Sequence, residues 1–131
     1  MNIWNAETAA DSLLKRGLQC HYRKTKSANF RVVNGEPPRE ISISLARKNG
    51  VTVYVNRYSA LGVAFPEESL EGIQVLEKYP RGHEGVNGNP GISESVARNN
   101  PSLDPASNDV LRLDIRDDPA LARLLEWYAG K

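Results

Sequence analysis

The sequence predicts one α+β domain over residues 1–131, with a mostly antiparallel sheet of about five strands flanked by N- and C-terminal helices. Apolar residues recur every three or four positions at both ends of the chain, as in amphipathic helices. Between the ends they alternate with polar residues, as in strands with one buried face. Hydrophobic residues make up 40% and charged residues 25%, which is ordinary for a globular domain. Glycine and proline concentrate in 80–92 and 99–109, where we expect long loops.

The first helix is expected to begin just after Asn5. The Asn5 side chain can accept a hydrogen bond from a free amide of the first turn, and Gly17 can end the helix in the left-handed conformation. Ile3 and Trp4 are predicted to pack onto the domain as an anchor before the helix. The apolar face would consist of Ala6, Ala9, Ala10, Leu13 and Leu14.

Two strands are expected next, joined by a positively charged turn. Leu18, Cys20 and Tyr22 alternate with polar residues, and 30–33 is the second apolar segment. Successive side chains of a strand point to opposite faces, so Cys20 and His21 should be separated by the sheet. We interpret Cys20 as a small buried apolar residue.

The clearest strand signal is a hairpin over residues 41–56. Asn49-Gly50 is a typical two-residue type I′ turn, because both of its central positions need positive φ. Residues 41, 43, 45, 51, 53 and 55 are apolar and should face the core. The polar residues between them, which include Tyr54 and Asn56, should face away from it.

The second half of the chain predicts shorter elements. Strands are expected over 63–65 and from Ile73 to Pro80, a short helix over 93–99, and an apolar, central strand over 110–115.

The last helix is expected to have Asp118 as its N-cap and Pro119 as its first residue. Its apolar stripe would contain Leu121, Leu124, Leu125 and Tyr128, and Gly130 would end it. The order of elements favours an arrangement with both terminal helices on one face of the sheet.

Charge is distributed unevenly along the chain. Residues 1–57 contain ten Lys/Arg and four Asp/Glu, whereas residues 58–131 contain seven and twelve, so the net charge of +1 conceals a dipolar molecule. From Lys15 to Arg31 there are six cationic side chains and no acidic one. Such a segment creates a positive potential that attracts polyanions.

The basic segment therefore predicts a nucleic-acid surface, in which cations bind phosphates and aromatic rings stack on bases. Tyr22 and Phe30 bracket the segment, and the hairpin would extend the same surface. The candidate residues are Lys15, Arg16, Tyr22, Arg23, Lys24, Lys26, Phe30, Arg31, Arg47, Lys48, Tyr54, Asn56 and Arg57. The alternative is a solvated cationic turn whose charge is complemented within the fold by the acidic half.

A second candidate site is a glycine-rich loop. Glycine lets backbone amides approach an anion closely, and a helix that begins at Ser93 would add its positive end. The spacing matches neither the P-loop nor the dinucleotide-binding fingerprint. We favour a loop that orders on a partner over a phosphate cradle. The residues are Arg81, Gly82, His83, Gly85, Gly88, Gly91 and Ser93.

Other chemistry is poorly supported by the sequence. A single cysteine excludes an internal disulfide, two histidines and one cysteine do not have the spacing of a zinc site, and no G-x-S-x-G motif is present. We therefore expect no cofactor and no metal. The apolar runs are far shorter than the ~20 residues that span a bilayer, and no secretory signal is visible. We expect a cytoplasmic protein without a membrane partner.

These observations predict a non-catalytic module that binds nucleic acid or a nucleoprotein complex. A small protein–protein inhibitor or adaptor, of the kind found in mobile elements and defence systems, is the first alternative. A small enzyme that acts on phosphoesters at the glycine-rich loop is the second.

Overall fold

The computed structural model describes residues 3–32, 39–46, 50–66, 70–82 and 94–130. They form one antiparallel sheet of six strands in the order β1-β2-β3-β4-β6-β5, so the predicted α+β class is confirmed with one strand more than expected. The strands are β1 (Gln19–Arg23), β2 (Ser27–Val32), β3 (Arg39–Ser44), β4 (Thr52–Asn56), β5 (Ile73–Tyr79) and β6 (Val110–Ile115).

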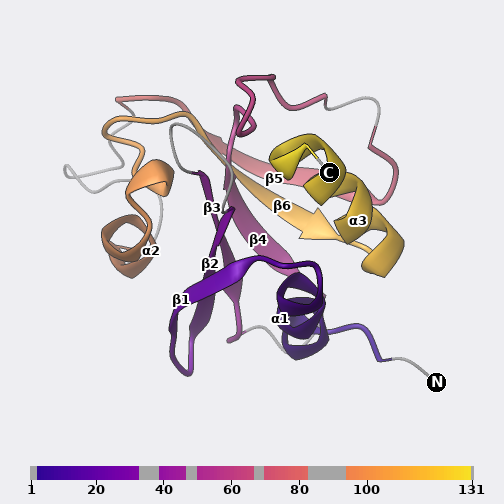
Figure 1. The fold of residues 1–131 in the computed structure, drawn as a ribbon. Coiled ribbons are helices and arrows are strands. Elements are labelled where there is room, and N and C mark those ends of the chain that lie inside the picture. Colours follow the sequence, from indigo (N-terminus) through magenta and orange to yellow (C-terminus); the bar gives the residue numbers. More distant parts are fainter. Residues whose placement is uncertain (1–2, 33–38, 47–49, 67–69, 83–93, 131) are drawn as a thin grey trace.

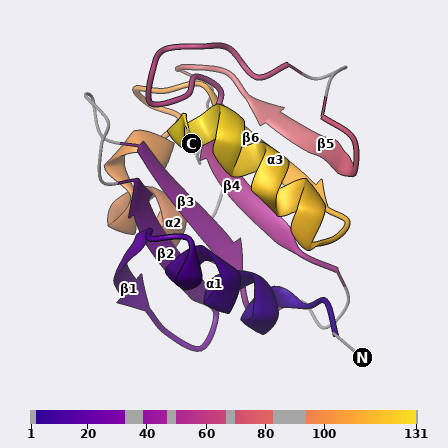
Figure 2. The same cartoon turned by 45° about the vertical axis from the view of Figure 1, so that its right-hand side comes forward.

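The helices form a layer on each side of the sheet. The terminal helices α1 (Ala6–Lys15) and α3 (Asp118–Ala129) lie on one face, as predicted, which we call the helix face (Figures 1 and 2). The short helix α2 (Glu94–Asn99) and the 3-10 helix η2 (Pro101–Leu103) lie on the opposite face, which we call the second face (Figure 1).

Two hydrophobic clusters of unequal size hold these layers together. The larger cluster lies between the sheet and the terminal helices, and Leu13, Phe30, Leu113 and Leu124 are fully buried in it. The smaller one joins α2 and η2 to the second face through Tyr79, Val96, Leu103 and Val110. Most of the apolar area is thus buried under α1 and α3, while the second face has a mainly polar interior.

Helix α1 begins where the sequence predicts. Asn5 and Thr8 form a capping box, in which the Thr8 amide donates to Asn5 Oδ1 at 2.9 Å. Two details differ from the prediction: Leu14 is 46% exposed and Ile3 is 69% exposed. Trp4 does act as an anchor, because its Nε1 donates to the Ile115 carbonyl at 2.9 Å.

The β3–β4 hairpin is confirmed, but its register is not the one that the predicted two-residue turn would give. Such a turn at Asn49-Gly50 would pair an odd-numbered residue of β3 with an even-numbered residue of β4. The observed register pairs Ile43 with Val53, which keeps both apolar sets on one face. Core patterning therefore overrides the local turn signal; Asn49 itself lies outside the described residues.

Most of the other predicted elements are present with small shifts, but the strand expected at 63–65 is not. The N-cap of α3 is Asp117 rather than Asp118, and its side chain accepts a hydrogen bond from the Ala120 amide, which lowers the pKa of that carboxyl. The segment at 63–65 makes only an isolated bridge, between Tyr58 and Ala64. The predicted loop at 99–109 contains η2, with Leu103 fully buried. Strand β6, which was expected to be central, is paired on both sides but lies next to the edge strand β5.

Candidate nucleic-acid interface

The basic segment is divided between the two faces of the sheet. A β-bulge shifts the register between Cys20 and Tyr22, so that Cys20 pairs with Phe30 and Tyr22 pairs with Asn29. Phe30 belongs to the core under the terminal helices, whereas Asn29 bonds to Asn100 on the other side. Tyr22 therefore lies on the second face, and the expected single surface does not form.

On the helix face, two of the predicted cations are paired with carboxylates. Arg16 binds Asp118 of α3 with an N–O distance of 2.9 Å, and Arg23 binds Glu7 of α1. Asp118 belongs to the acidic half of the chain, so this part of the basic segment is complemented within the fold. Lys15 is exposed nearby, beside the start of α3.

On the second face, the cations near the β1–β2 turn are exposed. The Lys24 ammonium lies 5.7 Å from the centre of the Tyr22 ring. Within the described part of the chain, Lys24, Lys26 and Arg31 have no carboxylate within 4.0 Å. We call Tyr22, Lys24, Lys26 and Arg31 the basic edge, because they lie on the edge strand β1 or next to it. Lys24 and Lys26 are at the β1–β2 turn, whereas Arg31 is in β2 opposite Gln19, at the other end of β1. The basic edge places cations beside a half-exposed aromatic ring.

Two residues that were predicted to contact nucleic acid are buried, so they do not belong to the binding surface. Phe30 is fully buried in the core, so its ring cannot stack on a base. Asn56 is 3% exposed, and its side-chain amide donates to the Ser102 carbonyl at 3.0 Å. The face that was expected to be open is covered at this point by η2, a segment more than 40 residues away in the sequence.

The remaining hairpin residues have separate positions. Tyr54 is half-buried on the second face, where burial raises its pKa, with Arg112 opposing and Glu77 supporting the shift. Arg57 is exposed beyond the end of β4, with its guanidinium 5.7 Å from the Tyr58 ring. Arg47 and Lys48 lie outside the described residues.

A pocket of about 210 Å3 opens on the second face next to the basic edge. It lies over the start of β2, the second half of β3 and the middle of β4, and it is bounded by Val96 of α2. Its lining residues are Lys26, Ser27, Ser42, Ser44, Ala46, Tyr54 and Val96. We call it the serine pocket. Lys26 joins it to the basic edge, so the two features form one continuous site.

A buried polar network supports the serine pocket from below. Asn29 Oδ1 accepts hydrogen bonds from Ser42 Oγ at 2.7 Å and from Asn100 Nδ2 at 2.8 Å. Asn29 and Asn100 are both fully buried. These bonds attach the end of α2 to the middle of the sheet and fix the pocket floor. This network was not predicted from the sequence, although polar residues at every second position of β2 and β3 are its signal.

A second cluster continues the network toward η2. Glu40 is 3% exposed, and its Oε1 accepts from the Ser102 amide at 3.0 Å and from Ser102 Oγ at 2.9 Å. His21 Nε2 lies 3.0 Å from the Asn99 carbonyl and 3.3 Å from Glu40 Oε2. These contacts tie β1 and β3 to the α2–η2 segment. His21 is thus held in a structural position on the second face, whereas Cys20 packs against the main core.

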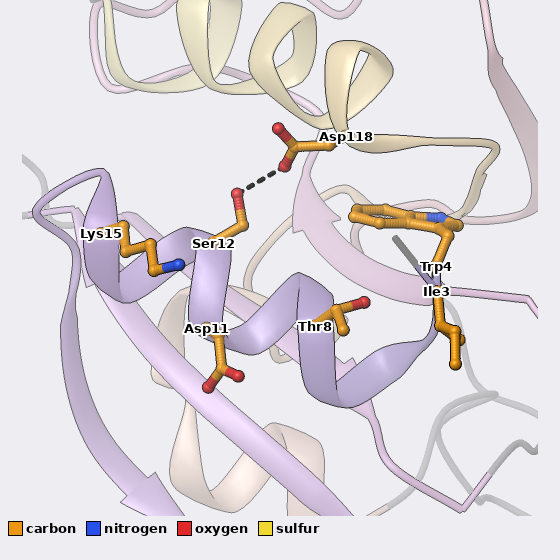
Figure 3. A pocket seen from close by; sticks show the side chains of 7 residues that line it. All are labelled: Ile3, Trp4, Thr8, Asp11, Ser12, Lys15 and Asp118. Carbon is orange, nitrogen blue, oxygen red and sulfur yellow. Dashed lines mark hydrogen bonds between the residues drawn. The ribbon is translucent and has the colours of Figure 1, made fainter. Parts of the chain in front are cut away.

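A larger pocket, of about 450 Å3, lies between α1 and the start of α3 (Figure 3). Several of its polar groups already form hydrogen bonds within the protein. Ser12 points across the gap and donates to Asp118 Oδ1 at 2.6 Å, whereas Asp11 points away from it (Figure 3). The Trp4 indole N–H is already bonded to Ile115, and Thr8 belongs to the capping box. We therefore interpret this pocket as a structural gap between α1 and α3 rather than as a ligand site.

The glycine-rich loop is described only at its beginning. The Arg81 amide donates to Asp109 Oδ1 at 2.9 Å, and the Gly82 amide donates to the Pro105 carbonyl at 2.7 Å. These bonds direct the two amides into the protein. The other predicted loop residues, His83, Gly85, Gly88, Gly91 and Ser93, lie outside the described residues.

The described part of the chain contains no group of three or more His, Cys, Asp or Glu side chains that could hold a metal ion. None of its helices combines the length and the apolar character that crossing a bilayer requires. Comparison of the chain with protein-family models, curated proteins and solved structures gives no match.

Proposed function

We propose that the protein is a non-catalytic module that binds single-stranded nucleic acid, alone or within a nucleoprotein complex, at the basic edge. The observation that carries the proposal is the arrangement of Tyr22, Lys24 and Lys26. The Lys24 ammonium lies 5.7 Å from the Tyr22 ring centre, and both lysines are exposed on the same side of the sheet as the ring. A phosphate and its neighbouring base can therefore be bound at adjacent positions.

A single strand suits this surface better than a duplex. Stacking on an aromatic side chain requires bases that are free of the double helix. The basic edge follows strands β1 and β2 and has no projecting helix of the kind that enters a major groove. The exposed Glu77 lies on β5, at the far edge of the sheet, where it is bonded to Arg112 and Tyr79. Glu40 lies opposite Arg31 in β3, but its carboxylate is buried and bonded to Ser102. The charge distribution thus favours binding of the nucleic acid along strands β1 and β2.

The experiment is a fluorescence-anisotropy titration of labelled single-stranded RNA, single-stranded DNA and duplex DNA. Affinity for single strands should fall steeply between about 50 and 200 mM salt, because phosphate contacts release counterions. The double variant Lys24→Ala/Lys26→Ala should bind at least about tenfold more weakly and lose roughly 1.4 from the salt slope, or ~0.7 for each lost phosphate contact.

The matched control is Lys15→Ala/Arg57→Ala, which removes the same charge from two exposed positions away from the basic edge. It should keep its affinity within about twofold. The proposal fails if no oligonucleotide binds at low salt, if binding is indifferent to salt, or if the control loses as much affinity as Lys24→Ala/Lys26→Ala.

One observation favours the alternative of a protein–protein adaptor. The segment that follows β4 exposes two apolar side chains, Leu61 at 73% and Val63 at 55%. A pull-down after nuclease treatment that recovers one defined protein, and that Leu61→Ser/Val63→Ser abolishes, would favour this function. Recovery that depends on intact nucleic acid would favour the first proposal.

A further inference from the structure

Among the described residues that line the serine pocket, only Lys26 is charged. The described lining consists of one lysine, three serines, one tyrosine and two small apolar residues, with no carboxylate. Lys26 is exposed at its mouth, whereas Ser42 is 1% exposed at its floor. A hollow with this lining favours an anion over a cation or a neutral apolar group.

The hydrogen-bonding state of the serines also favours an anion. Ser27 Oγ accepts from Asn29 Nδ2 at 3.3 Å, so its own proton remains available to a ligand. Ser44 Oγ forms no hydrogen bond with the described residues, so it can donate as well. Only the Ser42 proton is committed, to Asn29 Oδ1. Two hydroxyl donors and an ammonium group therefore face one space.

The position of the pocket relates it to the proposed nucleic-acid surface. Lys26 belongs to both the basic edge and the serine pocket. A nucleic-acid strand bound along the basic edge therefore reaches the pocket at Lys26. The volume of about 210 Å3 exceeds that of several water molecules, which leaves room for a phosphate and part of its sugar. The Tyr54 ring and Val96 supply an apolar wall for that sugar.

We infer that the serine pocket binds the terminal phosphate of a single-stranded nucleic acid, with Lys26, Ser27 and Ser44 as its donors. The inference rests on the proposed function and names the part of the ligand that the site selects. A terminal phosphate monoester carries more charge than an internal phosphodiester and has three acceptor oxygens. Its three oxygens match the three donors Lys26, Ser27 and Ser44 next to the basic edge. Charge-assisted hydrogen bonds of this type are stronger than neutral ones.

The test compares one RNA sequence in three forms, with hydroxyl groups at both ends, with a 5′-phosphate, or with a 3′-phosphate. One phosphorylated form should bind at least about tenfold more tightly than the hydroxyl form. Ser44→Ala and Lys26→Met should remove most of this difference. Ser44→Ala should leave the hydroxyl form within about twofold of its wild-type affinity, because Ser44 lies in the pocket and outside the basic edge.

The matched control is Lys24→Met, which removes a basic-edge cation that does not line the pocket. It should weaken all three forms by the same factor and so preserve the preference for a terminal phosphate. Inorganic phosphate provides a second readout. In an NMR titration it should shift the amide resonances of Ser27 and Ser44 in the wild type, and Lys26→Met should abolish these shifts.

The possible failures are distinguishable. If all three RNA forms bind with equal affinity, the terminal-phosphate assignment is overturned while the nucleic-acid function stands. If Lys26→Met weakens all three equally, the pocket serves an internal phosphodiester, which also overturns it. If no RNA form binds at all, the proposed function fails, and the inference fails with it.

Discussion

The Tyr128 hydroxyl donates a hydrogen bond to the backbone carbonyl of Glu40 at 2.5 Å, from the last turn of α3 to strand β3. The same oxygen accepts the Asn56 amide of β4 at 3.0 Å. Tyr128 is fully buried, so one side chain at the end of the chain bridges two neighbouring strands inside the core. The bridge sits behind Glu40, whose carboxylate holds Ser102 on the opposite face.

Tyr128→Phe should destabilise the protein by about 1–3 kcal/mol, because it leaves a buried amide and a buried carbonyl without this partner. Chemical denaturation measures the change. Tyr58→Phe is the control, since Tyr58 is 37% exposed, and it should stay within about 0.5 kcal/mol of the wild type. Equal stability of the two variants would contradict the role of the bridge.

Stability should fall at alkaline pH. Burial raises the pKa of Tyr128 above its ordinary value, and burial with the hydrogen bond to Glu77 does the same for Tyr79. In the unfolded chain both ionise near pH 10. Their stabilising contribution is therefore complete below about pH 10 and is lost as the pH rises toward the folded-state pKa values.

The contribution of Tyr128 can be isolated by comparing pH profiles. Above about pH 10, the wild-type free energy of unfolding should fall more steeply than that of Tyr128→Phe, by up to about 1.4 kcal/mol per pH unit. Urea denaturation at several pH values provides the measurement. Parallel profiles would show that Tyr128 ionises equally in both states.

Gly72 and Gly17 make a matched pair of glycines with positive φ, at 86° and 90°. A Cβ at Gly72 would lie 2.8 Å from the Ala120 Cβ, whereas a Cβ at Gly17 meets nothing within 4 Å. Gly17→Ala should cost about 1–2 kcal/mol through backbone strain alone. Gly72→Ala should cost a further 1–3 kcal/mol, roughly the penalty of an overpacked contact. Equal losses of stability for Gly72→Ala and Gly17→Ala in thermal unfolding would contradict the close approach of α3 to Gly72.

Asn100→Ala should loosen the second layer. The Asn100 amide donates to Asn29 and, at 3.0 Å, to the Val96 carbonyl, and its loss should cost about 1–3 kcal/mol. Hydrogen exchange should then become faster in α2 and η2 than in α1. Asn99→Ala changes a neighbouring side chain that makes no hydrogen bond with the described residues, and its exchange pattern should match the wild type. Uniform acceleration across the chain would show that the two layers open together.

Asp118→Asn should free Arg16 without improving nucleic-acid binding. The pair is partly exposed, with side chains 36% and 49% accessible, so its loss should change stability by less than about 1 kcal/mol. The protein gains one positive charge on the helix face, away from the basic edge. Affinity for single-stranded RNA should stay within about twofold of the wild type at 150 mM salt, roughly where the Debye length is 8 Å. A large gain would place the binding surface on the helix face.

The elements that the sequence predicts well are those whose signals are local. Asn5 caps α1 through an amide three residues away, and Gly130 ends α3 with a φ of 73°. The alternation in β3 and β4 also identifies the core side of both strands, because the side-chain period is a property of the strand itself. The Asn49-Gly50 turn signal was wrong about register, because the apolar pattern on both strands outweighs it.

The candidate site could be predicted only in part. Lys24 and Lys26 were recognised from charge, and both remain on an exposed edge. The prediction for Phe30 was wrong, because its ring points to the helix face with Ala28 and Val32, where the terminal helices bury it. Asn29 and Asn100 were missed, because a buried polar side chain becomes evident only when its partner, 71 residues away, is in place.

By itself, the sequence determined the class of the fold, the ends of the terminal helices to within one residue and the side of each hairpin strand that is buried. Only the tertiary structure decided how the cationic segment is distributed. The bulge between Cys20 and Tyr22 reverses the faces along β1, and α3 brings Asp118 to Arg16. The physical reason is the sequence separation of the interacting residues. Helix caps and strand alternation depend on neighbours along the chain, whereas exposure and charge pairing depend on segments that meet only after folding.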